Sequence, residues 1–287
     1  MSACAIPLKH GVDFGRVSGI KSLPPFPAVA CKLLSLMSND EANFREVSEL
    51  LTTDTALSGQ VLRVANSALF GFRQEVKSIL QALCLVGANR VRDVVVTVAL
   101  KNYIGRNDAE GLRACWRHNL ATALWAEALS RWYKLDGPMS YTAGLLHDVG
   151  RVVLLMLLPT DYAAFLEESA TMDTDWRTVE RELFDFDHCQ IGHYLSRLWN
   201  FQPVFTDVIG HHHDGITSET PQARALAQAA CVAASMSGFH TAGPPRTWDP
   251  ARIAALSPQA GKGSLPPMDR LLQKVVDELN LIECSLL

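Results

Sequence analysis

Apolar residues along this chain recur every three to four positions, a spacing that predicts a succession of α-helices. In the segment 43–51, Phe44, Val47 and Leu51 share one helical face, and Asn43 stands where a helix N-cap is expected. No segment shows sustained alternation of apolar and polar residues, so the predicted fold class is all-α. Helices are predicted over residues 33–37, 43–51, 54–69, 78–100 in two segments, 116–133, 141–149, 176–184, 189–199, 204–212, 223–237 and 268–279.

The two helical segments between residues 78 and 100 meet at Gly87, in an arrangement similar to a helix-turn-helix bend. A DNA-reading helix needs polar and basic side chains that reach the bases. Here only Arg90 and Arg92 are basic, and the apolar run 94–96 follows them. The pattern therefore favours packing within a helical bundle over DNA recognition.

Two other segments limit the architecture. The aliphatic run Val152–Leu158 stops at Pro159 and is far shorter than the roughly 20 apolar residues that cross a bilayer, so it is predicted to be a core segment. The proline-rich stretch 243–267 is predicted to be an extended loop before the last helix. No membrane association is expected.

Composition is that of a soluble globular protein. The chain has 287 residues, 48% hydrophobic and 20% charged, with a net charge of −4 that disfavours nucleic-acid binding. Its seven cysteines form no CxxC pair, so neither a disulfide framework nor a zinc-thiolate motif is indicated. Residues 1–15 lack the apolar segment of a secretory signal. We expect a cytoplasmic protein.

Histidines are concentrated in the second half of the chain. Eight of the nine lie between His118 and His240, and they include the pair His147–Asp148 and the run 211–213. Imidazole and carboxylate together suit divalent metals such as Zn, Mn or Fe, which can activate water for attack on phosphorus. Adjacent side chains diverge on a helix, so His147 and Asp148 would share a site only beside a helix end.

Each of these residues also has a purely structural interpretation. His118 could be a hydrogen-bonded core residue, since Leu120 and Leu124 lie on the same helix. His147 and Asp148 could cap a helix, although an apolar neighbourhood would then require partners for them. His193 is interpreted as a surface or packing residue, and the run 211–213 could be a solvated turn.

Several motifs together resemble the HDOD family, the HD-related output domains. The resemblance spans roughly residues 16–240. It rests on Leu23–Pro27, Thr53-Asp54-x-Ala56-Leu57, Val61-Leu62-Arg63-x-x-Asn66-Ser67, Ser78–Gly87, Gly144–Arg151, Asp187–Ile191 with Gly192, Trp199–Phe201 and His212–His213.

This resemblance implies a fold and a site. HDOD proteins are similar to HD and HD-GYP phosphohydrolases, act in bacterial signal transduction, and are generally thought not to hydrolyse phosphodiesters. It implies an N-terminal helical bundle packed on a C-terminal HD-like helical domain. It also implies that six residues descend from metal ligands, namely His118, His147, Asp148, His188, His212 and His213.

The chain departs from the hydrolytic relatives at three places. The stretch 227–232 contains no carboxylate where HD phosphohydrolases supply a last Asp, so a ligand is interpreted as missing. Arg151 replaces the Lys of HD-GYP enzymes, and the run Asp214–Thr217 lacks their Gly-Tyr-Pro segment. In addition, Gln202-Pro203 shifts the usual proline after Trp199 by one place.

We therefore predict a tail (1–15), an N-terminal helical subdomain (16–105), an HD-like subdomain (106–240), and a loop with a C-terminal helix (241–287). The favoured function is a bacterial signalling regulator that binds a protein partner or a ligand through a degenerate HD site. The alternatives are a metal-dependent phosphohydrolase acting on a nucleotide or cyclic dinucleotide, and a nucleotide or metal sensor. The candidate cofactor is a divalent metal, Fe, Mn or Zn, and self-association through residues beyond 240 is a further alternative.

Overall fold

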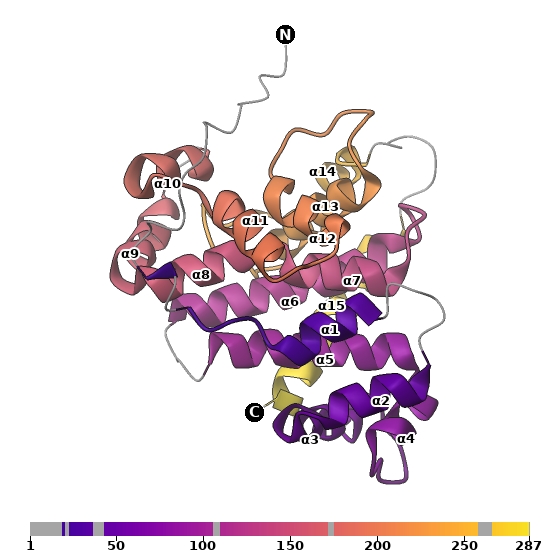
Figure 1. Ribbon diagram of the computed structural model, residues 1–287. Coiled ribbons are helices and arrows are strands. Elements are labelled where there is room, and N and C mark those ends of the chain that lie inside the picture. The colour runs from indigo at the N-terminus through magenta and orange to yellow at the C-terminus, as the bar shows by residue number, and fades with distance from the viewer. Residues whose placement is uncertain are drawn as a thin grey trace.

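The structure is a computed structural model that describes residues 19–20, 23–36, 43–105, 110–171, 175–257 and 266–286. All regular secondary structure in these residues is helical, which confirms the predicted all-α fold (Figure 1). The predicted tail 1–15 lies outside the described residues, and the subdomain boundaries stay predictions.

The helices are α1 (Ala28–Leu36), α2 (Phe44–Thr52), α3 (Thr55–Ala65), α4 (Ile79–Val86), α5 (Ala88–Ile104), α6 (Glu110–Ser130), α7 (Gly137–Leu146), α8 (Val149–Leu157), α9 (Pro159–Ser169), α10 (Trp176–Phe184), α11 (His188–Leu198), α12 (Pro203–His211), α13 (Gln222–Met236), α14 (Pro250–Ala255) and α15 (Met268–Leu286).

Short polar side chains fix where several helices begin. Asn43 accepts a 2.9 Å hydrogen bond from the amide of Arg45 and caps α2, as predicted. Asp54, Ser78 and Asp136 cap α3, α4 and α7 in the same way. These caps separate consecutive helices, so the chain can fold back at each junction.

Helix α6 is the centre of the molecule. It packs against α7 and α13, with α1–α5 on one side of the α6–α7 layer and α11–α13 on the other (Figure 1). Trp125 of α6 is fully buried. A Cβ at Gly144 would lie 2.7 Å from the carbonyl oxygen of Thr122, so only glycine allows α7 to approach α6 this closely. This close packing brings the end of α7 beside the middle of α6.

Helices α4 and α5 meet at Gly87 and pack as part of the bundle, as the sequence favoured. The two arginines of α5 are held in ion pairs. Arg92 is buried and contacts Asp93 at 3.1 Å, while Arg90 lies 2.9 Å from both Glu127 and Glu278.

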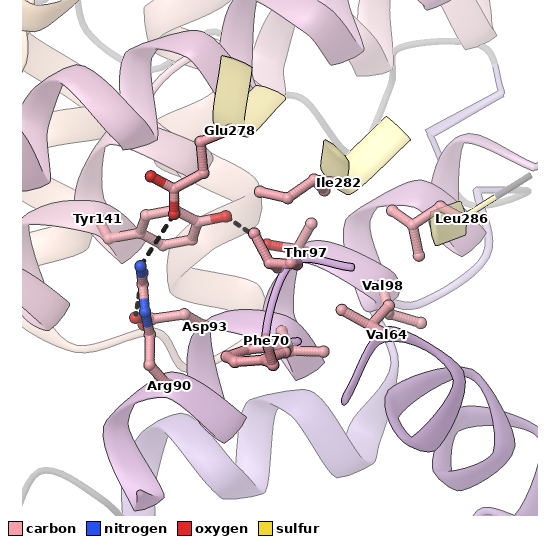
Figure 2. Close-up of a pocket in the computed structure, with 12 residues that line it drawn as sticks. Val64, Phe70, Arg90, Asp93, Thr97, Val98, Tyr141, Glu278, Ile282 and Leu286 are labelled. Carbon is pink, nitrogen blue, oxygen red and sulfur yellow. Dashed lines mark hydrogen bonds and ion pairs between the residues drawn. The ribbon is translucent and has the colours of Figure 1, made fainter. Parts of the chain in front are cut away.

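The C-terminal helix α15 links the two halves of the bundle. It extends to Leu286, seven residues beyond its predicted end at 279, and it contacts both α3 and α6. Figure 2 shows Glu278, Ile282 and Leu286 of α15 lining a cavity together with residues of α3, α5 and α7. Its volume of about 20 Å³ is enough for one water molecule. Helix α15 therefore closes over α5.

Other expectations need correction. The helix predicted over 141–149 is two helices, because α7 ends at Leu146 and α8 begins at Val149. Helix α9 was not predicted, because Pro159 was interpreted only as the end of the preceding apolar run. In the structure Pro159 begins α9, at the first helical position, where no N–H donor is needed. Helix α14 lies within the predicted loop 243–267, part of which falls outside the described residues. Among the described helices, none combines the length and apolar character needed to cross a bilayer.

Candidate functional site

The break between α7 and α8 places His147 and Asp148 in one site. His147 is the C-terminal cap residue of α7, and Asp148 precedes α8 with φ −112° and ψ 28°, outside helical geometry. On an uninterrupted helix their side chains would diverge by about 100°. Here both are buried and both contact the same histidine cluster.

Five predicted histidines form a continuous cluster of rings. They come from α6, the α7–α8 junction, the start of α11 and the end of α12, so the fold brings together residues 95 positions apart. His118, His147, His188 and His212 are each exposed by no more than 2%. The ring centroids are separated by 5.2 Å (His118–His147), 4.8 Å (His147–His212), 5.6 Å (His188–His212), 5.1 Å (His188–His213) and 4.2 Å (His212–His213).

Main-chain carbonyls orient three of these rings. The Nδ1 atom of His118 lies 2.6 Å from the carbonyl oxygen of Phe239, and that of His147 lies 2.7 Å from the carbonyl of Gly144. The Nδ1 atom of His212 lies 3.2 Å from the carbonyls of residues 208 and 209. Because a carbonyl can only accept, each Nδ1 carries the proton and each Nε2 keeps a lone pair that can accept a hydrogen bond or bind a metal.

Burial also keeps these three rings neutral. It lowers the pKa of His118, His147 and His212 to about 3, because an imidazolium is poorly solvated inside the protein. Neutral imidazole with a protonated Nδ1 is the form that binds a metal through Nε2.

A buried ionic network lies beside the rings. The Nε atom of Arg151 donates to Asp148 Oδ2 at 2.7 Å, and one of its terminal nitrogens lies 3.3 Å from His188 Nε2. Glu180 accepts from the Tyr162 hydroxyl and from His188 Nδ1, both at 2.5 Å. The carboxylates of Asp148 and Glu180 are thus held by positive and hydrogen-bonding groups.

These partners keep both carboxylates charged. Burial raises the pKa of each, but the positive charges of Arg151 and His188 outweigh burial at Asp148, whose pKa lies well below its usual value. At Glu180, His188 and Arg151 outweigh burial and lower the pKa to about 2.

The cluster contains donors suited to a divalent metal. The Nε2 atoms of His147 and His212 and Oδ1 of Asp148 are buried without a hydrogen-bond partner among the described residues. Two groups of donors lie close enough to share an ion: His118 with His147 and Cys231, and His188 with Cys189 and His212. Buried polar atoms without partners are costly, and a bound cation would satisfy them. The residues present therefore fit such an ion.

All six predicted ligand residues lie in or beside this cluster, whereas His193 does not: its Nδ1 faces the carbonyl of Thr206. Sequence reasoning missed Glu180, because it lies on an otherwise solvent-facing helix with several charged residues, and its burial follows from packing alone. It also missed Cys189 and Cys231, because neither belongs to a close cysteine pair, the pattern that indicates a metal site in a sequence.

A separate groove of about 810 Å³ lies where α3, α5, α6 and α15 meet. Its described lining carries four cationic side chains against the one carboxylate of Glu283, which already pairs with Arg117 at 3.1 Å. Arg63 and Arg113 are exposed and, within the described residues, have no ion-pair partner. The groove is therefore electropositive on a chain whose net charge is negative.

Comparison with known proteins identifies the family. The model of the HDOD domain matches residues 23–215, which include all six predicted ligand residues. The chain belongs to the HDOD family. Among curated relatives, an uncharacterized protein of Treponema pallidum (strain Nichols) is 25% identical over 200 residues, covering 68% of this chain and 38% of the relative. Uncharacterized protein YuxH of Bacillus subtilis (strain 168) is 28% identical over 110 residues, covering 38% and 27%. The chain thus spans well under half the length of these relatives.

Solved structures share the fold. An HDOD domain protein of unknown function from Geobacter sulfurreducens superposes with a TM-score of 0.73 at 20% identity, covering 92% of each chain. A candidate phosphohydrolase from Shewanella amazonensis SB2B gives 0.72 at 23% identity over 94% of this chain and 97% of that chain. A candidate signal transduction protein from Marinobacter aquaeolei VT8 gives 0.72 at 21% identity over 92% and 59%. At these identities the likeness establishes the fold alone.

Proposed function

We propose that this protein is a bacterial signal-transduction regulator that acts by binding a partner, and that its HD site does not hydrolyse phosphodiesters. The observation that carries the proposal is the position of Arg151. Its guanidinium is bonded to Oδ2 of Asp148 and lies against His188, so a fixed cation already neutralises the carboxylate and, among the described residues, leaves only Oδ1 without a hydrogen-bond partner. A regulator needs this site to stay folded, but it does not need the site to catalyse a reaction.

Burial supports the same function. Catalytic metal sites keep an open position for water or substrate. The side chains of His118, His147, Asp148, His188 and His212 are only 1–3% exposed, so no phosphate group of a dinucleotide could reach their donor atoms without rearrangement.

The electropositive groove is the surface we assign to the partner. It lies between the helices of the predicted N-terminal subdomain, the HD-like helix α6 and the terminal helix α15. Exposed guanidinium groups recognise carboxylates and phosphates through paired hydrogen bonds. An acidic segment of a signalling protein fits this lining, and a nucleotide is the alternative occupant.

Metal-dependent phosphohydrolysis is the second candidate, favoured by the unpartnered Nε2 atoms of His147 and His212. A bound ion would supply an activated water for attack on phosphorus. In that case the histidines would hold the ion, Asp148 would orient it, and Arg151 would bind a phosphate oxygen.

Two measurements separate these functions. Purified full-length protein is loaded with Mn²⁺ or Fe²⁺ and incubated with cyclic dinucleotides, nucleotides and a chromogenic phosphodiester. We expect no turnover; hydrolysis that is lost in the His147→Ala, Asp148→Ala double variant would refute the proposal.

The second measurement is complementation of a deletion strain, scored by its transcript profile. We expect the double variant to restore the profile if it folds, and the groove variant Arg63→Glu, Arg113→Glu to fail. Arg45→Glu, an exposed charge reversal on α2, is the matched control. Equal complementation by the groove variant and the control would remove the groove from the proposal.

A further inference from the structure

Cys231 places a thiol where the sequence comparison indicates a missing ligand. It lies on α13 within the stretch 227–232, and its Sγ is 3.5 Å from Nε2 of His118 on α6. Helix α13 packs directly against α6, so this approach is part of the core packing. The stretch without a carboxylate therefore still presents a metal-binding atom to the cluster.

His147 provides a second, independent indication of a ligand at this point. Its Nε2 atom is buried without a hydrogen-bond partner among the described residues, and its ring is 1% exposed. One donor atom each from His118, His147 and Cys231 lies within 4.8 Å of the other two. Since carbonyl groups fix both Nδ1 protons, the two Nε2 lone pairs are left for a common ligand.

The spacing fits tetrahedral coordination. With Zn–S near 2.3 Å and Zn–N near 2.0–2.1 Å, a tetrahedral angle places sulfur and nitrogen roughly 3.5 Å apart. The Cys231–His118 separation is 3.5 Å. These two atoms could therefore bind one ion without a change in their separation.

We propose that His118, His147 and Cys231 form a thiolate-containing metal centre that prefers zinc to manganese or magnesium. Soft thiolate ligands select zinc, whereas carboxylate sites suit magnesium and manganese. On binding, the S–H bond of Cys231 breaks, the sulfur donates an electron pair to the ion, and the proton leaves to solvent. The inference rests on the proposed function, in which the site has no turnover and therefore needs no open position for substrate.

Cobalt substitution tests the ligand directly. Full-length protein is treated with chelator, titrated with Co²⁺, and followed by absorbance. We expect a thiolate-to-cobalt charge-transfer band in the near ultraviolet and the visible bands of tetrahedral cobalt. Cys231→Ser should lose the charge-transfer band and weaken zinc binding by at least the roughly 10- to 100-fold that loss of an outer-shell partner costs. Cys231→Asp should keep Co²⁺ but lose that band.

Other cysteines provide the controls. Cys84 is exposed and Cys84→Ser should leave the band unchanged. Cys189→Ser tests the neighbouring donor group, and a band that depends on Cys189 instead of Cys231 would overturn the proposal. So would the absence of the band from folded wild-type protein. Phosphodiester hydrolysis by the same metal-loaded sample would refute the proposed function while leaving the thiolate ligand in place, so the two failures are distinguishable.

Discussion

Nε of Arg151 donates a 2.7 Å hydrogen bond to Oδ2 of Asp148, and both side chains are buried. Replacing Arg151 with Met would leave the carboxylate without its cation, a change that typically costs about 3–5 kcal/mol of unfolding free energy. Added Zn²⁺ should restore part of this stability by taking the place of the guanidinium. Urea unfolding with and without zinc measures both effects.

Arg197→Met is the control for this variant. Arg197 is exposed on α11, so its removal should change the unfolding free energy by no more than about 0.5 kcal/mol. Equal losses in the two variants would contradict a special role for the Arg151–Asp148 pair.

A methyl group at Gly150 should separate α8 from α11. A Cβ there would lie 1.9 Å from the carbonyl oxygen of His188, a main-chain atom that cannot move alone. We expect Gly150→Ala to destabilise the protein by about 1–3 kcal/mol or more. Gly59→Ala on α3, with nothing within 4 Å of its Cβ, should instead stabilise it by about 0.4–1 kcal/mol. Thermal unfolding of the Gly150→Ala and Gly59→Ala variants measures these opposite changes in stability.

Acid should destabilise the metal-free protein through its buried histidines. The pKa of His147 is about 3 in the folded chain against about 6.5 when unfolded, so between these values the unfolded state binds more protons. Stability is therefore complete above pH 6.5 and falls on acidification, by about 1.4 kcal/mol per pH unit for each such histidine. In His147→Gln the slope of unfolding free energy against pH should be shallower by that amount. An unchanged slope would mean that His147 titrates in the folded protein.

Helix α15 should be an integral part of the fold although it lies beyond the family match. Leu279 is fully buried, so Leu279→Ala should cost about 2–5 kcal/mol. Leu281, two residues further on, is 40% exposed and provides a matched control with little effect. Limited proteolysis and urea unfolding of both variants test whether α15 is integral to the fold. If α15 were only loosely attached, the Leu279 and Leu281 variants would be equally stable.

Helix periodicity predicted most of the described helices. The family motifs pointed to the six predicted ligand residues, and the fold brings these residues into or beside one cluster, although their role as ligands stays a prediction. What they could not provide were contacts between distant helices. Glu180 has the sequence environment of a surface residue, and only the packing of α10 beside Tyr162 buries it. Likewise Cys231 lies among alanines on α13, and nothing in its local sequence indicates that His118, 113 residues earlier, lies against it.

The carbonyl of Phe239 holds His118 Nδ1 from a segment outside the residues that define the family. Trp125, on the same helix as His118, donates at 3.1 Å to Ser237 of that segment. The orientation of one ring in the cluster therefore depends on main chain that leads toward the C-terminus. A substitution among residues 237–239 would therefore change the orientation of a ring in the cluster, although these residues lie outside the family match.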